Sequence, residues 1–435
     1  MIVQPLEGKA LRAVHLATGR LNIWEGSVRS SKTVGSMLAW VQFVLTAPPG
    51  DLLMVGRTER TLKRNVIGPL QKMLGPTRCR FVAGEGELWI CGRLIYVVGA
   101  NNKEAVAKIQ GLGLVGAYVD ELALVPESFW LMLLTRLSVD GARLFATSNP
   151  DSPTHWLMRD FLAKARLHLD HDGTEHHHPD GIDLHRFSFN LDDNPTLPAD
   201  YVASLKAMFS GLWYKRFIQG LWVIADGVIW DMWHEPDHVT ATIPECTEYL
   251  LAVDYGTAGV FAAELLGRGV DDRVHVCAEW RWDAREERRQ LTDPEYSAAL
   301  RTWLDGLDPG QNAVRSTLPG ARTPSHVYVD PSASSFIAQL HRDGWYGVRQ
   351  ADNAVGDGLR TVGSLLASDR LRVHDTCAGL RKEIPGYVWD QKAAKIGEER
   401  PVKANDHSCD ALRYGIMGAR RWWRHWLTVD LAEVS

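Results

Sequence analysis

A glycine, a lysine and a threonine near the N-terminus have the spacing of a phosphate-binding loop. Gly26 opens the stretch GSVRSSKT, and Lys32 and Thr33 close it. In such a loop backbone N–H groups face the phosphates, the lysine reaches the outer phosphates and the hydroxyl binds Mg²⁺. Ser31 stands where a second glycine is usual. The apolar run over 34–45 predicts a helix whose positive end faces the phosphates. Taken alone, the stretch has a serine-rich cap at the start of a helix as its alternative interpretation.

Two adjacent carboxylates follow an apolar run farther along the chain. Residues 112–119 predict a buried strand, and Asp120 and Glu121 come directly after it. A P-loop ATPase needs an aspartate at such a strand end to order the Mg²⁺ shell. The neighbouring glutamate can polarise the attacking water as a general base. An acidic cap of a following helix is the alternative interpretation.

Polar residues also follow the next predicted strand. Residues 143–146 predict that strand, and Thr147, Ser148 and Asn149 come after it. At a nucleotide site they would sense the γ-phosphate or transmit its hydrolysis. The alternative is an ordinary turn before Pro150.

Three arginines are candidates for stabilising charge in a phosphoryl-transfer transition state. Arg29 lies inside the loop itself. Arg57 and Arg136 are weaker candidates for an arginine that acts on a neighbouring subunit, because an ordinary solvated side chain explains each of them.

Three aspartates in the C-terminal half suit a two-metal phosphodiesterase. Asp254 follows the predicted strand 249–253, and Asp330 follows the strand 326–329. Asp410 lies three residues after His407, so both occupy one face of a predicted helix. Carboxylates of this kind hold two Mg²⁺ or Mn²⁺ ions that activate water and stabilise the leaving oxygen. Each aspartate alone is also explained as a turn or cap residue.

The order of predicted elements indicates an α/β protein of more than one domain. Short apolar strands alternate with helices in the N-terminal half, which favours a mostly parallel sheet. The C-terminal half begins with three strand-like runs joined by tight turns, which predicts an antiparallel start. The 435 residues suffice for two or three domains, and we place the boundary near residues 225–245.

Composition excludes several classes of protein. The net charge of −5 gives no support for a globally basic DNA-binding protein, so any DNA surface must be local. Six cysteines form no C-x-x-C pair, which indicates reduced thiols rather than a disulfide framework or a zinc site. We expect neither secretion nor a membrane span, because no signal peptide and no run of eighteen apolar residues occurs. The histidine-rich stretch 170–183 is interpreted as a mobile surface loop in preference to a metal cluster.

Together these segments resemble the large subunit of terminases, the genome-packaging motors of tailed bacteriophages. The resemblance covers nearly all of residues 20–420. It implies an N-terminal P-loop ATPase domain of the additional-strand, RecA-like class and a C-terminal RNase H-like nuclease domain. The segments that carry it are GSVRSSKT (26–33), AYVDELALV (117–125), ATSNP (146–150), DDNPTLPADY (192–201), AVDYGTAG (252–259), VYVDPSAS (327–334) and NDHSCDALRYG (405–415).

The resemblance implies domain boundaries and residue roles. We expect an ATPase domain over 1–190, a linker or subdomain over 191–240, a nuclease domain over 241–420 and a tail over 421–435. Gln4 is a guess for the adenine contact. The implied nucleotide-binding residues are Gly26, Ser27, Val28, Arg29, Ser30, Ser31, Lys32, Thr33 and Asp120, and the coupling residues are Thr147, Ser148 and Asn149. The implied catalytic residues are Glu121, Arg29, Asp254, Asp330 and Asp410, and the implied metal ligands are Thr33, Asp120, Asp254, Asp330, Asp406, His407 and Asp410.

The resemblance also implies cofactors and partners. The cofactors are ATP and Mg²⁺, with Mn²⁺ as an alternative at the nuclease site. The implied partners are double-stranded DNA, a portal protein, a small terminase subunit and further copies of the chain in a ring, expected to be a pentamer. No membrane is involved, and the place of action is the host cytoplasm. DNA contacts would be directed at phosphates and therefore salt-sensitive, with 57–64 and 281–289 as candidate contacts, although a solvated surface explains both.

Three other functions fit parts of the pattern. A helicase or remodelling ATPase would use the C-terminal half only to bind nucleic acid, so metal-dependent cleavage that is lost when the three aspartates become asparagines would argue against it. A transposase or integrase of RNase H-like fold would transfer strands to target DNA, and it leaves the ATSNP segment unexplained. A structural assembly factor with a decayed P-loop would gain no thermal stability from MgATP.

Overall fold

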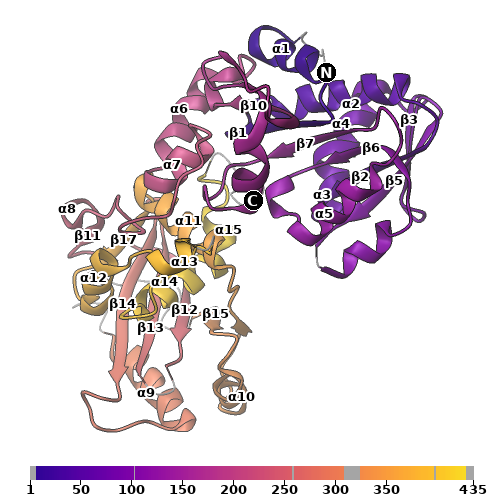
Figure 1. The fold of residues 1–435 in the computed structure, drawn as a ribbon. Coiled ribbons are helices and arrows are strands. Elements are labelled where there is room, and N and C mark those ends of the chain that lie inside the picture. The colour runs from indigo at the N-terminus through magenta and orange to yellow at the C-terminus, as the bar shows by residue number, and fades with distance from the viewer. Residues whose placement is uncertain (1–5, 102, 257–258, 308–323, 396–397, 428–435) are drawn as a thin grey trace. The chain divides into compact units, whose positions relative to one another are not determined.

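The chain divides into two compact units, and the polypeptide passes between them more than once. Figure 1 shows its path in the computed structural model, which describes residues 6–101, 103–256, 259–307, 324–395 and 398–427. The first unit comprises residues 1–198 and 214–224, and the second comprises residues 199–213 and 225–435. The segment 191–240, predicted as a linker or subdomain, is therefore shared between the two units.

The first unit is built on one ten-stranded sheet. Its strand order is β3-β4-β5-β2-β6-β7-β1-β10-β8-β9, and the seven strands from β5 to β8 run parallel. β1 and β6 are buried along their whole length, as parallel strands covered on both faces must be. The strands are β1 (Leu21–Gly26), β2 (Asp51–Gly56), β3 (Cys79–Val82), β4 (Glu87–Ile90), β5 (Arg93–Gly99), β6 (Leu114–Val119), β7 (Arg143–Ser148), β8 (Ala165–Leu169), β9 (Glu175–His177) and β10 (Ile182–Phe189).

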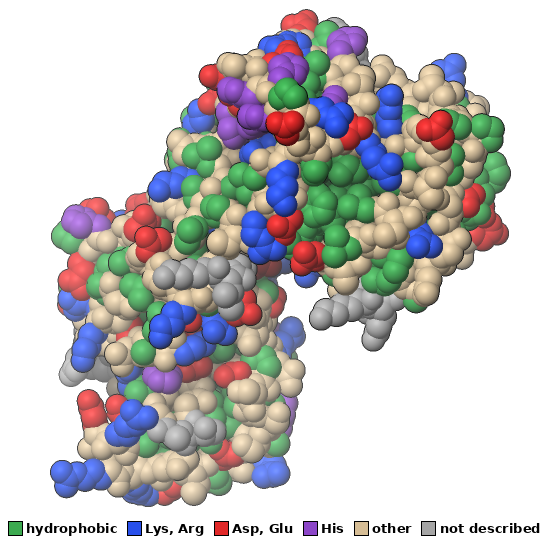
Figure 2. Space-filling model, in the orientation of Figure 1, with side chains coloured by type: hydrophobic (Ala, Val, Ile, Leu, Met, Phe, Trp, Pro, Cys, Tyr) green, Lys and Arg blue, Asp and Glu red, His purple; other side chains and the backbone are tan. Residues whose placement is uncertain are grey.

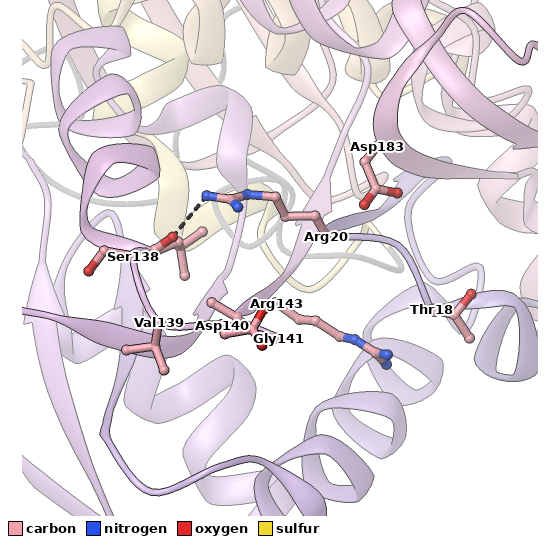
Figure 3. Close-up of a pocket in the computed structure, with 10 residues that line it drawn as sticks. Thr18, Arg20, Ser138, Val139, Asp140, Gly141, Arg143 and Asp183 are labelled. Carbon is pink, nitrogen blue, oxygen red and sulfur yellow. Dashed lines mark hydrogen bonds between the residues drawn. The ribbon is translucent and has the colours of Figure 1, made fainter.

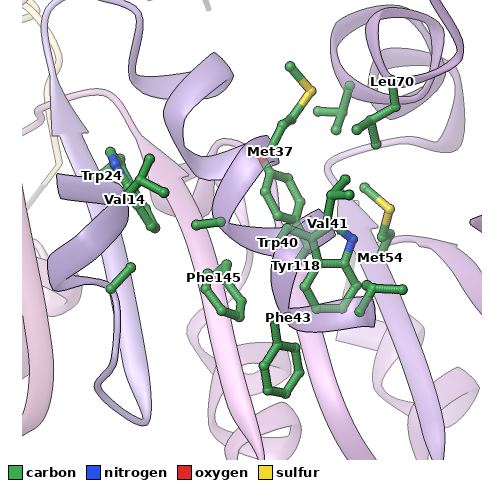
Figure 4. Close-up of a cluster of buried hydrophobic side chains, with 14 of the residues drawn as sticks. Val14, Trp24, Met37, Trp40, Val41, Phe43, Met54, Leu70, Tyr118 and Phe145 are labelled. Carbon is green, nitrogen blue, oxygen red and sulfur yellow. The ribbon is translucent and has the colours of Figure 1, made fainter. Parts of the chain in front are cut away.

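Two hydrophobic cores cover the two faces of this sheet. Side chains of β1 alternate between them, since Trp24 belongs to one cluster and Ile23 to the other. In the first cluster Trp24, Trp40 and Phe145 interlock, with ring centroids 5.8 Å apart for Trp40 and Phe145 (Figure 4). This packing holds α2 against the sheet and so fixes the N-terminus of that helix at the end of β1. The helices are α1 (Gly8–Leu16), α2 (Lys32–Thr46), α3 (Glu59–Leu62), η1 (Lys63–Ile67), α4 (Gly68–Leu74), η2 (Lys103–Ile109), η3 (Leu122–Leu124), α5 (Glu127–Arg136), η4 (Leu157–Phe161), η5 (Leu162–Lys164) and η6 (Leu191–Asp193).

The histidine-rich stretch predicted as a mobile loop is a β-hairpin instead. β9 pairs antiparallel with β8, and the Asp170 carboxylate holds the turn by accepting the Thr174 N–H at 3.0 Å and pairing with His176 at 2.6 Å. Figure 2 shows histidine side chains gathered on this part of the first unit. The loop prediction was wrong because the turn is closed by an aspartate, whose side chain caps backbone N–H groups without any apolar signal.

The second unit is built on a seven-stranded mixed sheet of order β11-β17-β14-β13-β12-β15-β16. β12, β13 and β14 are antiparallel, as predicted, and β15 and β16 then continue parallel to β12. Because β12 and β15 are parallel neighbours, their carboxyl ends lie side by side at one edge of the sheet. The strands are β11 (Val239–Thr240), β12 (Cys246–Asp254), β13 (Val260–Gly269), β14 (Val274–Asp283), β15 (His326–Val329), β16 (Val348–Gln350) and β17 (Leu371–His374).

Helix α14 packs directly on β12 and β13. A Cβ at Gly415 would lie 3.0 Å from Ala252 Cβ and 2.8 Å from Leu266 Cδ1, so the glycine permits this close approach. The approach brings the first turn of α14 to the carboxyl end of β12. The helices of this unit are α6 (Ala199–Met208), α8 (Glu235–His238), α9 (Asp293–Gly306), α10 (Ser334–Arg342), α11 (Val355–Ala367), α12 (Ala378–Glu383), η7 (Ile384–Gly386), α13 (Gln391–Lys395), α14 (His407–Gly418) and α15 (Arg420–Trp423).

The sequence pattern over 201–217 predicts a single helix, but the structure has two, α6 and α7 (Gly211–Phe217). The break covers 209–210, and Gly211, the first residue of α7, has a left-handed φ of +51° that a regular helix cannot accommodate. Among the helices that the structure describes, none has the length and apolarity to cross a membrane.

Candidate functional site

The predicted phosphate-binding loop connects β1 to α2. Gly26 has φ +130°, and a Cβ there would lie 1.9 Å from the Phe189 carbonyl oxygen, so this position requires glycine. Ser31, where a second glycine is usual, adopts a left-handed φ of +67°. A non-glycine residue in that conformation costs about 1–2 kcal/mol, which gives the physical reason for the usual glycine. The chain nevertheless completes the turn, and α2 begins at Lys32.

Lys32 is buried inside this loop. Its Nζ donates to the carbonyl oxygens of Gly26 (3.1 Å) and Ser27 (2.7 Å) and to Asn149 Oδ1 (2.7 Å). Burial lowers the pKa of Lys32 to about 8, against the opposing effect of nearby carboxylates led by Glu121. The three hydrogen-bond acceptors are uncharged oxygens, so a buried ammonium at the positive end of α2 suits a polyanionic ligand such as a nucleotide phosphate.

The carboxylates predicted for the ATPase site meet the predicted coupling residues. Thr147 Oγ1 donates to Asp120 Oδ1 at 2.7 Å and accepts the Glu121 N–H at 3.1 Å. Ser148 Oγ accepts the Ala123 N–H at 3.3 Å. Because Asn149 also binds Lys32, the end of β7 contacts both the loop and the carboxylate pair.

Burial perturbs both carboxylates, and the charge of Asp120 also acts on Glu121. Burial raises the pKa of Asp120 against the hydrogen bond from Thr147. For Glu121, burial and then the charge of Asp120 raise the pKa to about 7, while Lys32, Arg64 and Arg57 oppose the shift. A carboxyl with a pKa near neutrality is suited to accept a proton from water. Asp120, with Thr33 at the start of α2, supplies the hard oxygen donors that Mg²⁺ prefers.

Several supporting contacts of the loop were not anticipated from the sequence. Glu25, fully buried at the end of β1, accepts from Arg186 Nε at 2.9 Å and from Trp222 Nε1 at 3.0 Å. The Val28 N–H donates to the Phe217 carbonyl oxygen at 3.1 Å. A glutamate inside an otherwise apolar strand, directly before the loop glycine, was the available signal for the first of these contacts.

The segment DDNPTLPADY, which carried part of the resemblance, touches the loop directly. Asn194 Nδ2 donates to the Arg29 carbonyl oxygen at 2.6 Å, while the Arg29 side chain is exposed. Arg57 is also exposed and lies near Glu121 of its own chain, and Arg136 is half-buried at the end of α5. Gln4, the guess for the adenine contact, lies outside the described residues.

The predicted nuclease carboxylates converge in the second unit. Asp254 is the last residue of β12, Asp330 directly follows β15, and Asp410 lies in the first turn of α14. Burial raises the pKa of Asp254 to about 6, and the charges of Asp410 and Asp330 contribute to the rise. His407 Nδ1 lies 2.9 Å from Asp254 Oδ2, and this hydrogen bond raises the pKa of His407 and opposes the rise at Asp254.

A lysine pairs with two further carboxylates, Asp406 and Asp410. Lys403 Nζ lies 2.6 Å from Asp410 Oδ2 and 3.1 Å from Asp406 Oδ2. Asp410 Oδ1 accepts from Tyr387 Oη at 3.1 Å and from Arg413 Nη2 at 3.3 Å. In the described part of the chain no set of three His, Cys, Asp or Glu side chains has the arrangement of a complete metal site. The donors themselves fit Mg²⁺ or Mn²⁺, because a cluster of buried, mutually repelling carboxylates requires cations.

One of the candidate DNA-contacting segments is engaged inside the second unit. Arg281 donates to Glu383 Oε1 at 2.7 Å and to Ser408 Oγ, so it is not available as a surface contact. Its pKa is raised by Glu383 and Glu279, against the effect of burial. The prediction was wrong for Arg281 because Glu383, the carboxylate to which it donates, lies 102 residues away in the sequence. The arginines at 285, 288 and 289, and those of 57–64, are exposed.

A cavity of about 520 Å³ lies at the other end of the first sheet. Arg20, Arg143 and Asp183 line it, from the N-terminal ends of β1, β7 and β10 (Figure 3). Arg20 Nη2 donates to the Leu137 carbonyl oxygen at 2.8 Å. Since the phosphate-binding loop follows the carboxyl end of β1, this cavity is not part of the candidate nucleotide site.

Comparison with known proteins agrees with the resemblance stated from the sequence. The model of the phage terminase large-subunit family matches residues 19–211. The solved large terminase of a thermophilic bacteriophage is 33% identical, with a TM-score of 0.80 over 95% of this chain and 98% of that one. A second structure of the same phage protein, in complex with ADP, is 32% identical with a TM-score of 0.77, over 94% of this chain and 98% of that one.

Another relative matches a smaller part of the chain. The large terminase subunit of Escherichia phage T5 is 23% identical over 241 residues, which span 53% of this chain and 50% of that protein. These similarities confirm the predicted fold class, a P-loop ATPase fold followed by an RNase H-like fold, and the mixed sheets observed here agree with it.

Proposed function

Because this chain belongs to the family of phage terminase large subunits, we propose that it uses ATP hydrolysis to drive double-stranded DNA into a procapsid and cleaves that DNA with a metal-dependent nuclease. The observation that carries the motor function is the contact of β7 with both halves of the nucleotide site. Asn149 binds Lys32, and Thr147 binds Asp120 and the backbone of Glu121. A change at the nucleotide phosphates is thereby coupled to a strand of the sheet.

The residues of the first unit have distinct tasks in hydrolysis. Lys32 and the N-terminal amides of α2 would bind the phosphates, and Thr33 and Asp120 would hold Mg²⁺, which would supply positive charge at the phosphate oxygens. Glu121 accepts the proton of the attacking water, for which its pKa of about 7 is suited. Arg29, exposed in the loop, supplies positive charge to the transition state.

The residues of the second unit act on the phosphodiester. Asp254, Asp330 and Asp410, with Asp406 beside them, would hold divalent ions that activate water and stabilise the leaving oxygen. His407 orients Asp254 through its 2.9 Å hydrogen bond. Arg413 and Tyr387 orient Asp410 by binding its other oxygen.

The partners follow from the proposed task. We propose that the chain works as a homo-oligomeric ring, expected to be a pentamer, on a portal protein, that a small terminase subunit selects its DNA, and that it acts in the host cytoplasm. Exposed arginines at 57, 60 and 64 would contact DNA phosphates, so binding should weaken as salt rises.

The motor function is tested by ATP hydrolysis in the full chain. Lys32→Ala and Glu121→Gln should each abolish hydrolysis, whereas the exposed Lys72→Ala and Glu127→Gln should leave it unchanged. If both site variants retained hydrolysis, the assignment of residues 26–33 as a nucleotide-binding P-loop would be refuted.

The nuclease function is tested by plasmid cleavage with Mn²⁺. Asp254→Asn and Asp410→Asn should abolish cleavage and leave ATP hydrolysis intact. Cleavage at the wild-type rate in either variant would exclude that aspartate from the site. Absence of cleavage by the folded wild-type chain would favour an ATPase with a binding module.

A further inference from the structure

Lys403 reaches the predicted nuclease carboxylates from the surface. Its side chain is 65% exposed, whereas the side chains of Asp406 and Asp410 are 7% and 6% exposed. The ammonium lies between the two, at 3.1 Å from Asp406 Oδ2 and 2.6 Å from Asp410 Oδ2. A flexible surface side chain thus supplies the positive charge that two buried carboxylates need.

The two oxygens of Asp410 differ in the groups that bind them. Oδ1 accepts from Tyr387 and Arg413, whose side chains are almost fully buried and therefore fixed. Oδ2 accepts from Lys403, whose four-carbon stem is mostly in solvent. Withdrawal of Lys403 would leave Oδ2 without this partner while Oδ1 stays oriented.

We propose that Lys403 is a tethered cation that occupies the Asp406–Asp410 pair and must be displaced before a divalent ion binds there. The inference rests on the proposed nuclease function. A divalent ion coordinated to Asp410 Oδ2 and an ammonium bound to the same oxygen would lie within a few ångströms of each other and repel, so their binding is competitive. The metal affinity of the resting chain is therefore lowered, and the freed ammonium becomes available to a DNA phosphate.

The test is Mn²⁺ binding by the nucleotide-free full chain, measured by isothermal titration calorimetry and by the Mn²⁺-induced shift in melting temperature. Lys403→Gln should tighten Mn²⁺ binding by roughly tenfold, the factor that corresponds to one competing hydrogen bond between charged groups. Lys403→Arg keeps the charge and should not bind Mn²⁺ more tightly than wild type. Lys392→Gln, the same charge change at an exposed residue of α13, should leave the affinity unchanged.

The outcomes separate this inference from the proposed function. Wild-type affinity or weaker binding in Lys403→Gln, with binding lost in Asp410→Asn, would overturn the role of Lys403 and retain the nuclease site. Tighter binding in Lys392→Gln as well would overturn it too, since the effect would then be one of net charge. Mn²⁺ binding that Asp254→Asn and Asp410→Asn leave unchanged would overturn the metal site itself.

Discussion

Replacing Gly220 with alanine should damage the phosphate-binding loop from outside it. Gly220 has φ +71°, and a Cβ there would lie 2.4 Å from the Phe189 carbonyl oxygen, 2.9 Å from Ser27 N and 3.1 Å from Gly26 Cα. These are backbone atoms, and the first two are joined by a hydrogen bond of 2.8 Å. The loop and the segment 214–224 therefore cannot both keep their positions in Gly220→Ala.

The expected cost has two parts. Alanine in a left-handed conformation costs about 1–2 kcal/mol, and forcing a methyl group into a packed backbone costs about 1–3 kcal/mol. Gly92→Ala, in the turn between β4 and β5, is the matched control in the same unit, because Gly92 has φ +85° and nothing lies within 4 Å of the added Cβ. It should lose only the first part. At about 2–4 °C per kcal/mol for domains of this size, Gly220→Ala should melt roughly 2–12 °C below Gly92→Ala.

The assay is thermal unfolding of the full chain with and without MgADP. Ligand at about 100 times its Kd stabilises a folded protein by about 2.7 kcal/mol. Gly92→Ala should retain the wild-type shift, and Gly220→Ala should lose most of it because the loop amides are displaced. Equal melting temperatures and equal MgADP shifts in the two variants would refute the reasoning, since the segment would then yield without disturbing the loop.

Two further predictions concern pH. The kcat/KM for ATP hydrolysis should fall about tenfold per pH unit below about 7, because Glu121, whose pKa is about 7, must be deprotonated to act as the base; a profile that is flat from pH 5.5 to 8 would contradict this role. Burial and neighbouring Glu279 raise the pKa of Glu264 well above its ordinary value of 4.5. Above pH 4.5 the unfolded chain therefore releases this proton and the folded chain keeps it, so stability should decline by at most about 1.4 kcal/mol per pH unit until the folded pKa is reached. Glu264→Gln should remove that decline, as urea unfolding at several pH values would show, and an unchanged pH dependence would show that Glu264 is ionised in the fold.

Local patterns were sufficient for many of the individual elements. The strand predicted over 326–329 is β15, and the helix predicted over 34–45 is α2 with two residues added at its start and one at its end. Apolar runs bounded by turn residues, and apolar periodicity, depend on neighbours in the chain, so a sequence reveals them. The break between α6 and α7 depends on the backbone conformation of Gly211, and the hairpin between β8 and β9 depends on capping by Asp170. Apolar periodicity does not report either feature, so both were missed.

The predicted site residues were recognised as chemical types, but their contacts are a property of the tertiary structure. Asn149 and Lys32 are far apart in the chain and meet because β1 and β7 are parallel neighbours. Arg281, predicted as a surface contact, likewise meets a partner that is distant in the sequence, because it donates to Glu383. The charge and type of a residue do not identify its hydrogen-bond partner, because strand order and register determine which side chains meet.

The sequence by itself determined the family, the order of the motifs and the oxygen-rich donors of two candidate sites. Tertiary structure decided which donors are buried, what raises their pKa values and which cation neutralises them. The pKa values of Glu121 and Asp254 are raised first by burial, and burial depends on the segments of the chain that pack around each side chain. The position of Lys403 between Asp406 and Asp410 likewise follows from the path of the loop before α14, which no local pattern specifies.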